Sequence, residues 1–208
     1  MNPVEASASS AEKILLAATD LFAANHFNGV SIKEIAKKSG VNSALISYYF
    51  GGKKNLYQEV LNEQSNLFLN LIARVSSKDI APLAKLREYI TAISEVQKLH
   101  PHRIHLIYRE LLTPTFMCDS FIKNRLYKIH KFMSELVTEA IADGSIRNNM
   151  QPTHVAFTLE SIIVFFFLTH DLHQPFFHIF CLDYNKYFIF IHYIFQLICK
   201  KQAIKSHK

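Results

Sequence analysis

The sequence predicts an all-α protein in which a three-helix head precedes a helical bundle. Apolar residues recur with the helical period in nearly every segment between the Gly and Pro residues. No strand-turn-strand pattern, internal repeat or low-complexity linker interrupts the 208 residues. Since half of the residues are apolar, a chain of this length can bury the core of one or two domains.

The first expected helix covers residues 11–24, and its apolar residues share one face. That face consists of Ile14, Leu15, Ala18, Leu21 and Phe22. Residues 1–10, MNPVEASASS, lack the basic start and the apolar run of a secretion signal. We expect them to be disordered.

The stretch from Val30 to Tyr57 predicts two short helices separated by a glycine turn. Ser31 and Glu34 have the spacing of a capping box, and Gly40 suits the left-handed end of a helix. A second helix is expected from 43 to 49, capped by Asn42 or Ser43, with Leu45 and Ile46 as core anchors. Two helices around such a turn fit the DNA major groove, so DNA binding is the leading hypothesis.

These residues resemble the TetR family of one-component transcriptional regulators. The resemblance rests on the apolar helix before Gly29, on IleAla at 35–36, GlyVal at 40–41 and TyrTyrPhe at 48–50, and on Lys53 with Leu56. It implies that residues 11–56 form a DNA-binding domain. It also implies two sets of DNA contacts: base edges by Ser43, Ala44 and Tyr48, and phosphates by Ser31, Ser47, Tyr49 and Lys53.

Two positions depart from the family pattern. The family often has tyrosine where this chain has Ser47 and threonine where it has Leu45. The contacts at these positions are therefore expected to be shorter-ranged or absent, with more of the binding left to Tyr48 and Tyr49. Phe50 is expected in the core, because an apolar ring cannot contact phosphate.

Charge adds only weak support for DNA binding. The net charge is +6, yet residues 1–56 carry six lysines against four acids, and the tail from Lys200 holds four more lysines. Lys33, Lys37 and Lys38 fit a solvated helix face better than a phosphate contact.

Residues 57–203 are expected to form the ligand-binding and dimerisation bundle, and residues 204–208 a basic tail. After a helix over 53–74, breakers delimit helices near 83–99, 102–112, 117–142, 153–172 and 184–203. The last two are apolar on nearly every side, so we expect a second copy of the chain to cover them. In the resembled family these helices form a dimer interface, and two heads can read a palindrome. The predicted interface residues are Phe165, Phe166, Phe190 and Ile194.

Ile107–Met117 is the segment that attracts attention as a ligand site, because its ArgGlu pair followed by ProThr is similar to the TetR subgroup typified by CecR. An apolar pocket would suit a small apolar effector. The predicted pocket residues are Tyr108, Arg109, Met117, Phe121 and Phe132. These residues would also make an ordinary core, which is the more frequent outcome. Arg109 and Glu110 are adjacent and point to different faces, which favours separate structural ion pairs over one ligand clamp.

Metal, cofactor and enzyme functions are not expected. Eleven histidines include His100, His102 and His105 in one cluster and His170, His173 and His178 in another, but neither has convincing ligand spacing. The chain also lacks HExxH, a nucleophile elbow and a phosphate-binding glycine loop. Two alternatives to a ligand-controlled regulator remain: a metal-dependent helical enzyme that uses the histidines, and a regulator controlled by a protein partner.

The sequence thus predicts a homodimeric repressor that a small apolar effector releases from a palindromic DNA operator. Three cysteines at irregular spacing fit reduced thiols in the cytoplasm. The apolar run from Tyr187 to Cys199 is too short to span a bilayer.

Overall fold

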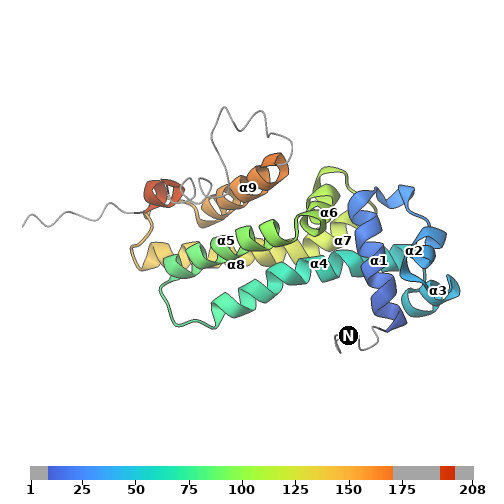
Figure 1. Cartoon of the computed structure of the whole chain (residues 1–208). Helices are drawn as coiled ribbons and strands as arrows, with labels where there is room; N and C mark the ends of the chain where they lie inside the picture. Colours follow the sequence, from blue (N-terminus) through green and yellow to red (C-terminus); the bar gives the residue numbers. More distant parts are fainter. Residues whose placement is uncertain (1–8, 171–192, 200–208) are drawn as a thin grey trace, which may run out of the picture. The chain divides into compact units, whose positions relative to one another are not determined.

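The computed structural model describes residues 9–170 and 193–199, which are almost entirely helical (Figure 1). Within these residues the β-type pairing is limited to an isolated bridge between Ile146 and Cys199. The all-α prediction is confirmed. Phe190, His173 and His178 lie outside the described residues, as does most of the helix expected over 184–203.

The chain divides into two compact units. The first comprises Met1–Phe68 and Lys98–Leu126, and the second comprises Leu69–Gln97 and Tyr127–Lys208. The first unit therefore joins the helix-turn-helix region to later helices, whereas the sequence predicted a boundary after residue 56. Helix α4, Lys53–Ser76, contributes residues to both units.

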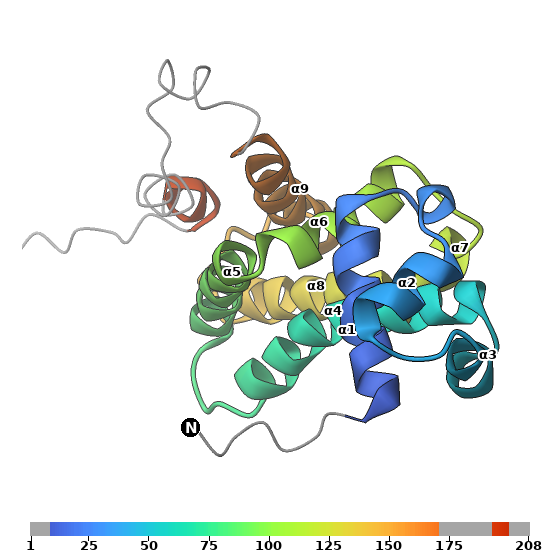
Figure 2. The ribbon, with the colours of Figure 1, turned by 45° about the vertical axis from the view of Figure 1, so that its right-hand side comes forward.

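The first unit is built around α1. It contains α1 (Ser10–Ala24), η1 (Phe27–Gly29), α2 (Ile32–Ser39), α3 (Ala44–Phe50), the start of α4, α6 (Pro101–Leu112), α7 (Cys118–Phe121) and η2 (Ile122–Leu126). Helix α1 packs against α2, α3 and α6 (Figure 2). The core side chains of the first unit are fully buried because the apolar residues of each helix share one face. They include Ile14, Phe22, Ile35, Ile46 and Leu56.

Helix α1 begins earlier than the sequence predicted. The Ser9 hydroxyl accepts from the Glu12 amide at 3.2 Å, and Glu12 accepts from the Ser9 amide at 2.7 Å. This capping box, with the same spacing as Ser31 and Glu34, makes Ser9 and Ser10 part of the folded head. Their assignment to a disordered tail was wrong.

The second unit contains α5 (Pro82–Leu99) up to Gln97, α8 (Tyr127–Ala142), α9 (Pro152–His170) and a helical segment over 193–198. The single helix predicted over 117–142 is wrong, because η2 is a π-helical segment between α7 and α8. A π-helical segment has wider turns than an α-helix, so it shifts the helical register between the two flanking helices.

Helix α9 is strongly apolar. By length and composition alone, the residues from Pro152 to Thr169 could cross a membrane, with a mean hydropathy of 1.5 over 18 residues. A core helix of a water-soluble protein meets the same criterion. In this structure α9 packs against α8 and buries Ala156, Leu159 and Ile163.

Candidate nucleic-acid interface

The start of α2 is fixed by the predicted capping box. The Ser31 hydroxyl accepts from the Glu34 amide at 3.2 Å, while a Glu34 oxygen accepts from the Ser31 amide at 2.7 Å. The Ser31 side chain and the Ser31 backbone amide both hydrogen-bond to the Glu34 carboxyl and lower its pKa, so it stays ionised as a cap. The Ser31 hydroxyl is thus engaged in the capping box, and its phosphate contact remains a prediction.

The turn between α2 and α3 contains the left-handed glycine that the sequence predicted. Gly40 is left-handed, with φ of 69°, and ends α2. Of the two expected caps, Asn42 acts, because its side-chain oxygen accepts from the Ala44 amide at 2.9 Å. Ser43 makes no side-chain capping bond, which leaves its hydroxyl for another partner.

Helix α3 presents the predicted contact residues on its exposed side. Ile46 is fully buried and anchors the helix, while Leu45 and Phe50 are half-buried. Tyr48 is 79 % exposed and Tyr49 is 46 % exposed, with their rings edge to face at 5.0 Å. Ser43, Ala44 and Ser47 are exposed as well. Ser43 lies one helical turn before Ser47, and Ala44 lies one turn before Tyr48, so these residues are neighbours on the helix surface.

Lys53 is the first residue of α4, as predicted, but its side chain has a partner that the sequence did not reveal. Its ammonium lies 4.1 Å from the centre of the Phe27 ring. Burial lowers the pKa of Lys53, and the negative charge of Glu34 opposes this effect. The phosphate contact of Lys53 remains a prediction, and Phe27 is the residue that orients its ammonium.

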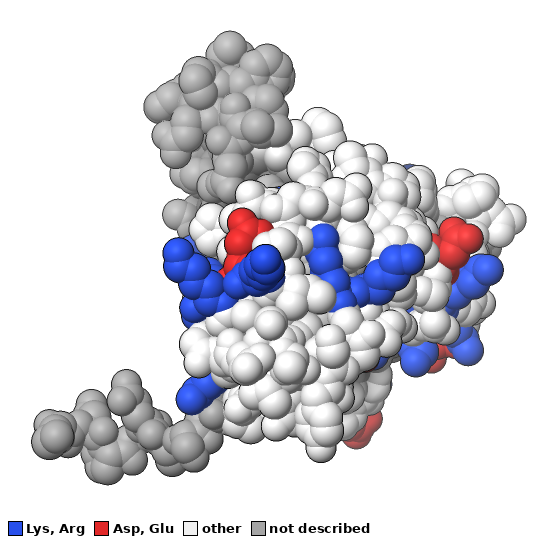
Figure 3. Space-filling model, turned by 90° about the vertical axis from the view of Figure 1, so that its right-hand side faces the viewer, with Lys and Arg blue, Asp and Glu red and all other residues white. Residues whose placement is uncertain are grey.

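Basic side chains gather on one face of the molecule. Figure 3 shows lysine and arginine side chains in a band across the face that it presents, with few acidic side chains among them. On α2, Lys33 and Lys37 are exposed, whereas Lys38 pairs with Asp20 of α1 at 3.0 Å. Lys38 is therefore partly neutralised within the head.

The predicted ligand-pocket residues do not share one described cavity. Arg109 lines a cavity of about 440 Å³ in the first unit, together with Phe27, Tyr57 and Phe116. The remaining four lie elsewhere: Met117 and Phe121 border a cavity of about 20 Å³, Tyr108 is buried, and Phe132 packs edge-on against Tyr89 in the second unit.

Arg109 and Glu110 form hydrogen bonds rather than the expected separate ion pairs. Arg109 donates to three backbone carbonyl groups at the end of α1. Glu110 is buried and accepts from Tyr57 and Thr115. Sequence reasoning could not find Tyr57 or the α1 carbonyl groups, because they lie more than 50 residues away along the chain.

The predicted dimer residues differ in exposure. On α9, Phe165 is 69 % exposed and Phe157, two turns earlier, is 66 % exposed. Phe166 is 6 % exposed, so it is already buried in the single chain. Ile194 is half-buried.

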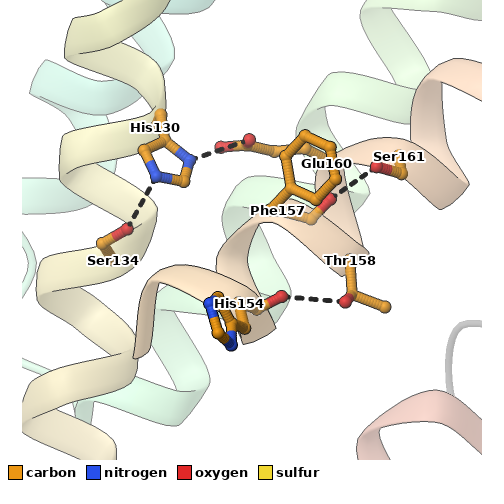
Figure 4. Close-up of polar contacts among 7 residues, drawn as sticks. All are labelled: His130, Ser134, His154, Phe157, Thr158, Glu160 and Ser161. Atoms are coloured by element: carbon orange, nitrogen blue, oxygen red, sulfur yellow. Dashed lines mark hydrogen bonds and ion pairs between the residues drawn. The ribbon is translucent and has the colours of Figure 1, made fainter. Parts of the chain in front are cut away.

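The described residues contain no group of three His, Cys, Asp or Glu side chains that could hold a metal ion. One histidine does have an acidic partner, in the contact between α8 and α9 (Figure 4). His130 Nδ1 lies 3.0 Å from an oxygen of Glu160, and the Ser134 hydroxyl lies 3.5 Å from the other ring nitrogen. The second Glu160 oxygen is buried without a hydrogen-bond partner.

Comparison with known proteins agrees with the geometry of the head. Residues 14–60 match the family model of bacterial regulatory proteins of the tetR family. The chain is 30 % identical over 146 residues to the HTH-type transcriptional regulator RutR of Escherichia coli K12, covering 70 % of this chain and 68 % of RutR. It is 24 % identical to the HTH-type transcriptional repressor KstR2 of Mycolicibacterium smegmatis, covering 69 % and 70 % of the two chains.

A solved structure shares the fold. The chain superposes on AibR, crystallised in complex with isovaleryl coenzyme A and operator DNA, with a TM-score of 0.67. The sequences are 23 % identical, and the match covers 77 % of this chain and 86 % of AibR.

Proposed function

Because the chain belongs to the TetR family of transcriptional regulators, we propose that it is a homodimeric repressor whose two α3 helices bind a palindromic operator. The observation that carries the proposal is the exposed side of α3, where small, hydroxyl-bearing and aromatic side chains surround a single buried anchor, Ile46. Such side chains can enter the major groove and hydrogen-bond to base edges or phosphates. The enzyme alternative is dropped, since the relatives are named transcriptional regulators.

The proposed contacts divide into two classes. Ser43, Ala44 and Tyr48 read base edges. The phosphate class consists of Ser31, Ser47, Tyr49 and Lys53. The loss of a phosphate contact weakens all sequences alike, whereas the loss of a base contact changes the preferred sequence.

Dimerisation supplies the second head. Phe157 and Phe165 form an exposed apolar strip on α9, the kind of surface that a partner subunit covers. A two-fold dimer places two recognition helices about 34 Å apart or somewhat more, one helical turn of DNA. The KstR2 relative is named a repressor, which supports repression as the mode of action. A protein that acts on operator DNA works where the DNA lies, so we place it in the cytoplasm.

Control by a small molecule is supported by AibR, a fold neighbour crystallised with an acyl coenzyme A and operator DNA. That the effector is small and largely apolar and releases the operator is our proposal. An inducer must bind the arrangement that does not bind DNA better than the one that does. A tenfold loss of operator affinity needs a difference of about 1.4 kcal/mol between the two affinities.

Selection of bound sequences from a random DNA library tests the proposal. At a stated salt concentration, the full chain should enrich a palindrome with two half-sites. Repeating the selection with candidate acyl compounds should abolish the enrichment for an inducer. Enrichment that no small molecule changes would favour control by a protein partner, and the absence of any enriched sequence would refute operator binding.

A further inference from the structure

Arg109 of α6 binds the end of α1. Its Nη1 donates to the carbonyl oxygens of Phe22 at 3.0 Å and Asn25 at 2.9 Å, and its Nη2 donates to that of Ala23 at 2.6 Å. The last carbonyl groups of a helix lack partners within the helix and carry partial negative charge. A planar guanidinium that meets three of them fixes both the distance and the orientation of the helix end.

The next residue, Glu110, binds α4. Its side chain is 1 % exposed, and one oxygen accepts from the Tyr57 hydroxyl at 2.8 Å. The other oxygen accepts from the amide and the hydroxyl of Thr115, at 2.9 and 2.7 Å. Burial, together with the hydrogen bond to Glu110, raises the pKa of Tyr57, so its hydroxyl remains a donor.

The two anchored positions meet in an aromatic cluster beneath the head. The Tyr57 ring lies 4.9 Å from that of Phe22 and 5.0 Å from that of Phe27. Phe27 in turn carries the Lys53 ammonium on its face. A movement of α6 would therefore displace the end of α1 and Lys53, the first residue of α4.

We propose that Arg109 and Glu110, hereafter the α6 clamp, are positioning residues that hold the head in the arrangement that binds operator DNA. Neither side chain belongs to the exposed face of α3, so the clamp acts through α1 and α4. Helix α1 transmits the position because it packs against both α2 and α3. This inference rests on the proposed operator binding.

The first test compares Arg109→Met with Arg109→Lys on the DNA that the unmodified chain selects. Methionine keeps much of the side-chain volume and removes all donors, so operator affinity should fall about tenfold or more. Lysine restores the charge but not the planar fork, so it should recover part of the loss. Arg103→Met is the matched control, because Arg103 also lies on α6 and has no hydrogen-bond or ion-pair partner among the described residues.

Far-UV circular dichroism and the melting temperature are recorded for each variant, and affinity is measured well below every melting temperature. Equal operator affinity of Arg109→Met and the unmodified chain would overturn the inference. So would an equal loss in Arg103→Met, since it would show an effect of charge alone.

A second readout does not need DNA. Tyr57→Phe removes the hydroxyl that Glu110 accepts from and leaves the aromatic cluster in place. Hydrogen exchange should become faster at the amides near Ala23 and Phe27 in Arg109→Met, and at those near Tyr57 and Thr115 in Tyr57→Phe. Unchanged exchange would overturn the clamp even if the chain binds DNA. If the unmodified chain selects no DNA but exchange changes as expected, the proposed function fails while the contacts of the clamp stand, and their role in operator binding is overturned with it.

Discussion

The ammonium of Lys53, at the start of α4, lies over the face of the Phe27 ring of η1, 4.1 Å from the ring centre. A cation over a ring is attracted by the negative face of the π system. The contact limits where the long lysine side chain can reach, so it aims the ammonium without help from DNA. A side chain that contacts phosphate can therefore already be held by a partner within the protein before DNA binds.

Lys53→Ala should weaken binding to all DNA sequences about equally. If the ammonium neutralises one phosphate, the slope of log affinity against log salt should decrease in magnitude by roughly one unit. Titrations at several salt concentrations measure the slope. Lys54→Ala is the control, because Lys54 lies over a different ring, that of Phe116, at 4.9 Å. An unchanged slope in Lys53→Ala would exclude the phosphate contact.

Tyr48→Ala should change which bases the protein prefers. Tyr48 is 79 % exposed, against 46 % for Tyr49, and a side chain in the groove meets base edges. Binding to a set of single-base operator variants measures the preference, with Tyr49→Ala as the comparison. If Tyr48→Ala weakens every operator variant by the same factor, Tyr48 belongs with the phosphate contacts.

Phe165→Glu should convert the dimer into a monomer. The substitution places a charge at a position that is 69 % exposed in the single chain and that we assign to the partner-covered strip. Light scattering at micromolar concentration measures the mass, and operator affinity should fall together with it. Leu112→Glu, at an exposed apolar position of α6, is the control and should remain dimeric. A monomeric unmodified chain contradicts the prediction.

Glu160→Gln should change how stability depends on pH. Burial raises the pKa of Glu160, and the hydrogen bond and charge of His130 oppose the shift. A carboxyl with a raised pKa binds its proton more tightly in the folded state. Folding therefore loses stability as pH rises from the ordinary glutamate pKa to the raised one, and regains it on acidification.

Melting curves from pH 4 to pH 8 should show that the unmodified chain falls behind Glu160→Gln as pH rises through this window. Glu135→Gln is the control, since it removes an exposed carboxylate of α8 whose pair with Lys131 is worth little. A gap between the unmodified chain and Glu160→Gln that narrows with rising pH would show that the His130 pair outweighs the cost of burial.

Local chemistry explains which parts of the structure the sequence could predict. The capping box of Ser31 and the left-handed Gly40 are short-range signals, so α2 and its end were predicted correctly. The same capping pattern occurs at Ser9, but it directly follows a segment whose composition favours disorder. The helical period also indicated Leu45 and Ile46 as core anchors of α3, of which Ile46 is fully buried and Leu45 only half-buried.

Long-range contacts explain what the sequence could not predict. No local pattern announces that Arg109 meets carbonyl groups 84–87 residues earlier in the chain. No local pattern predicts the π-helical segment η2 either. Its wider turns change the helical register between Phe121 and Phe132, so the spacing of a continuous α-helix does not predict which faces these two residues occupy. Both phenylalanines are buried, so their truncation would also open cavities in the core.

The cavity of about 440 Å³ makes the α6 clamp open to optical measurement. Its wall includes Arg109, Glu110 and Tyr57, and also Phe116, which is 51 % exposed. The chain contains no tryptophan, so Phe116→Trp would create a single indole beside the clamp. The wavelength of its fluorescence would depend on the hydration of the cavity and on the binding of any occupant, without an attached dye. A shift in that wavelength would report a change at the clamp, and the DNA-contacting residues of α3 would stay unmodified.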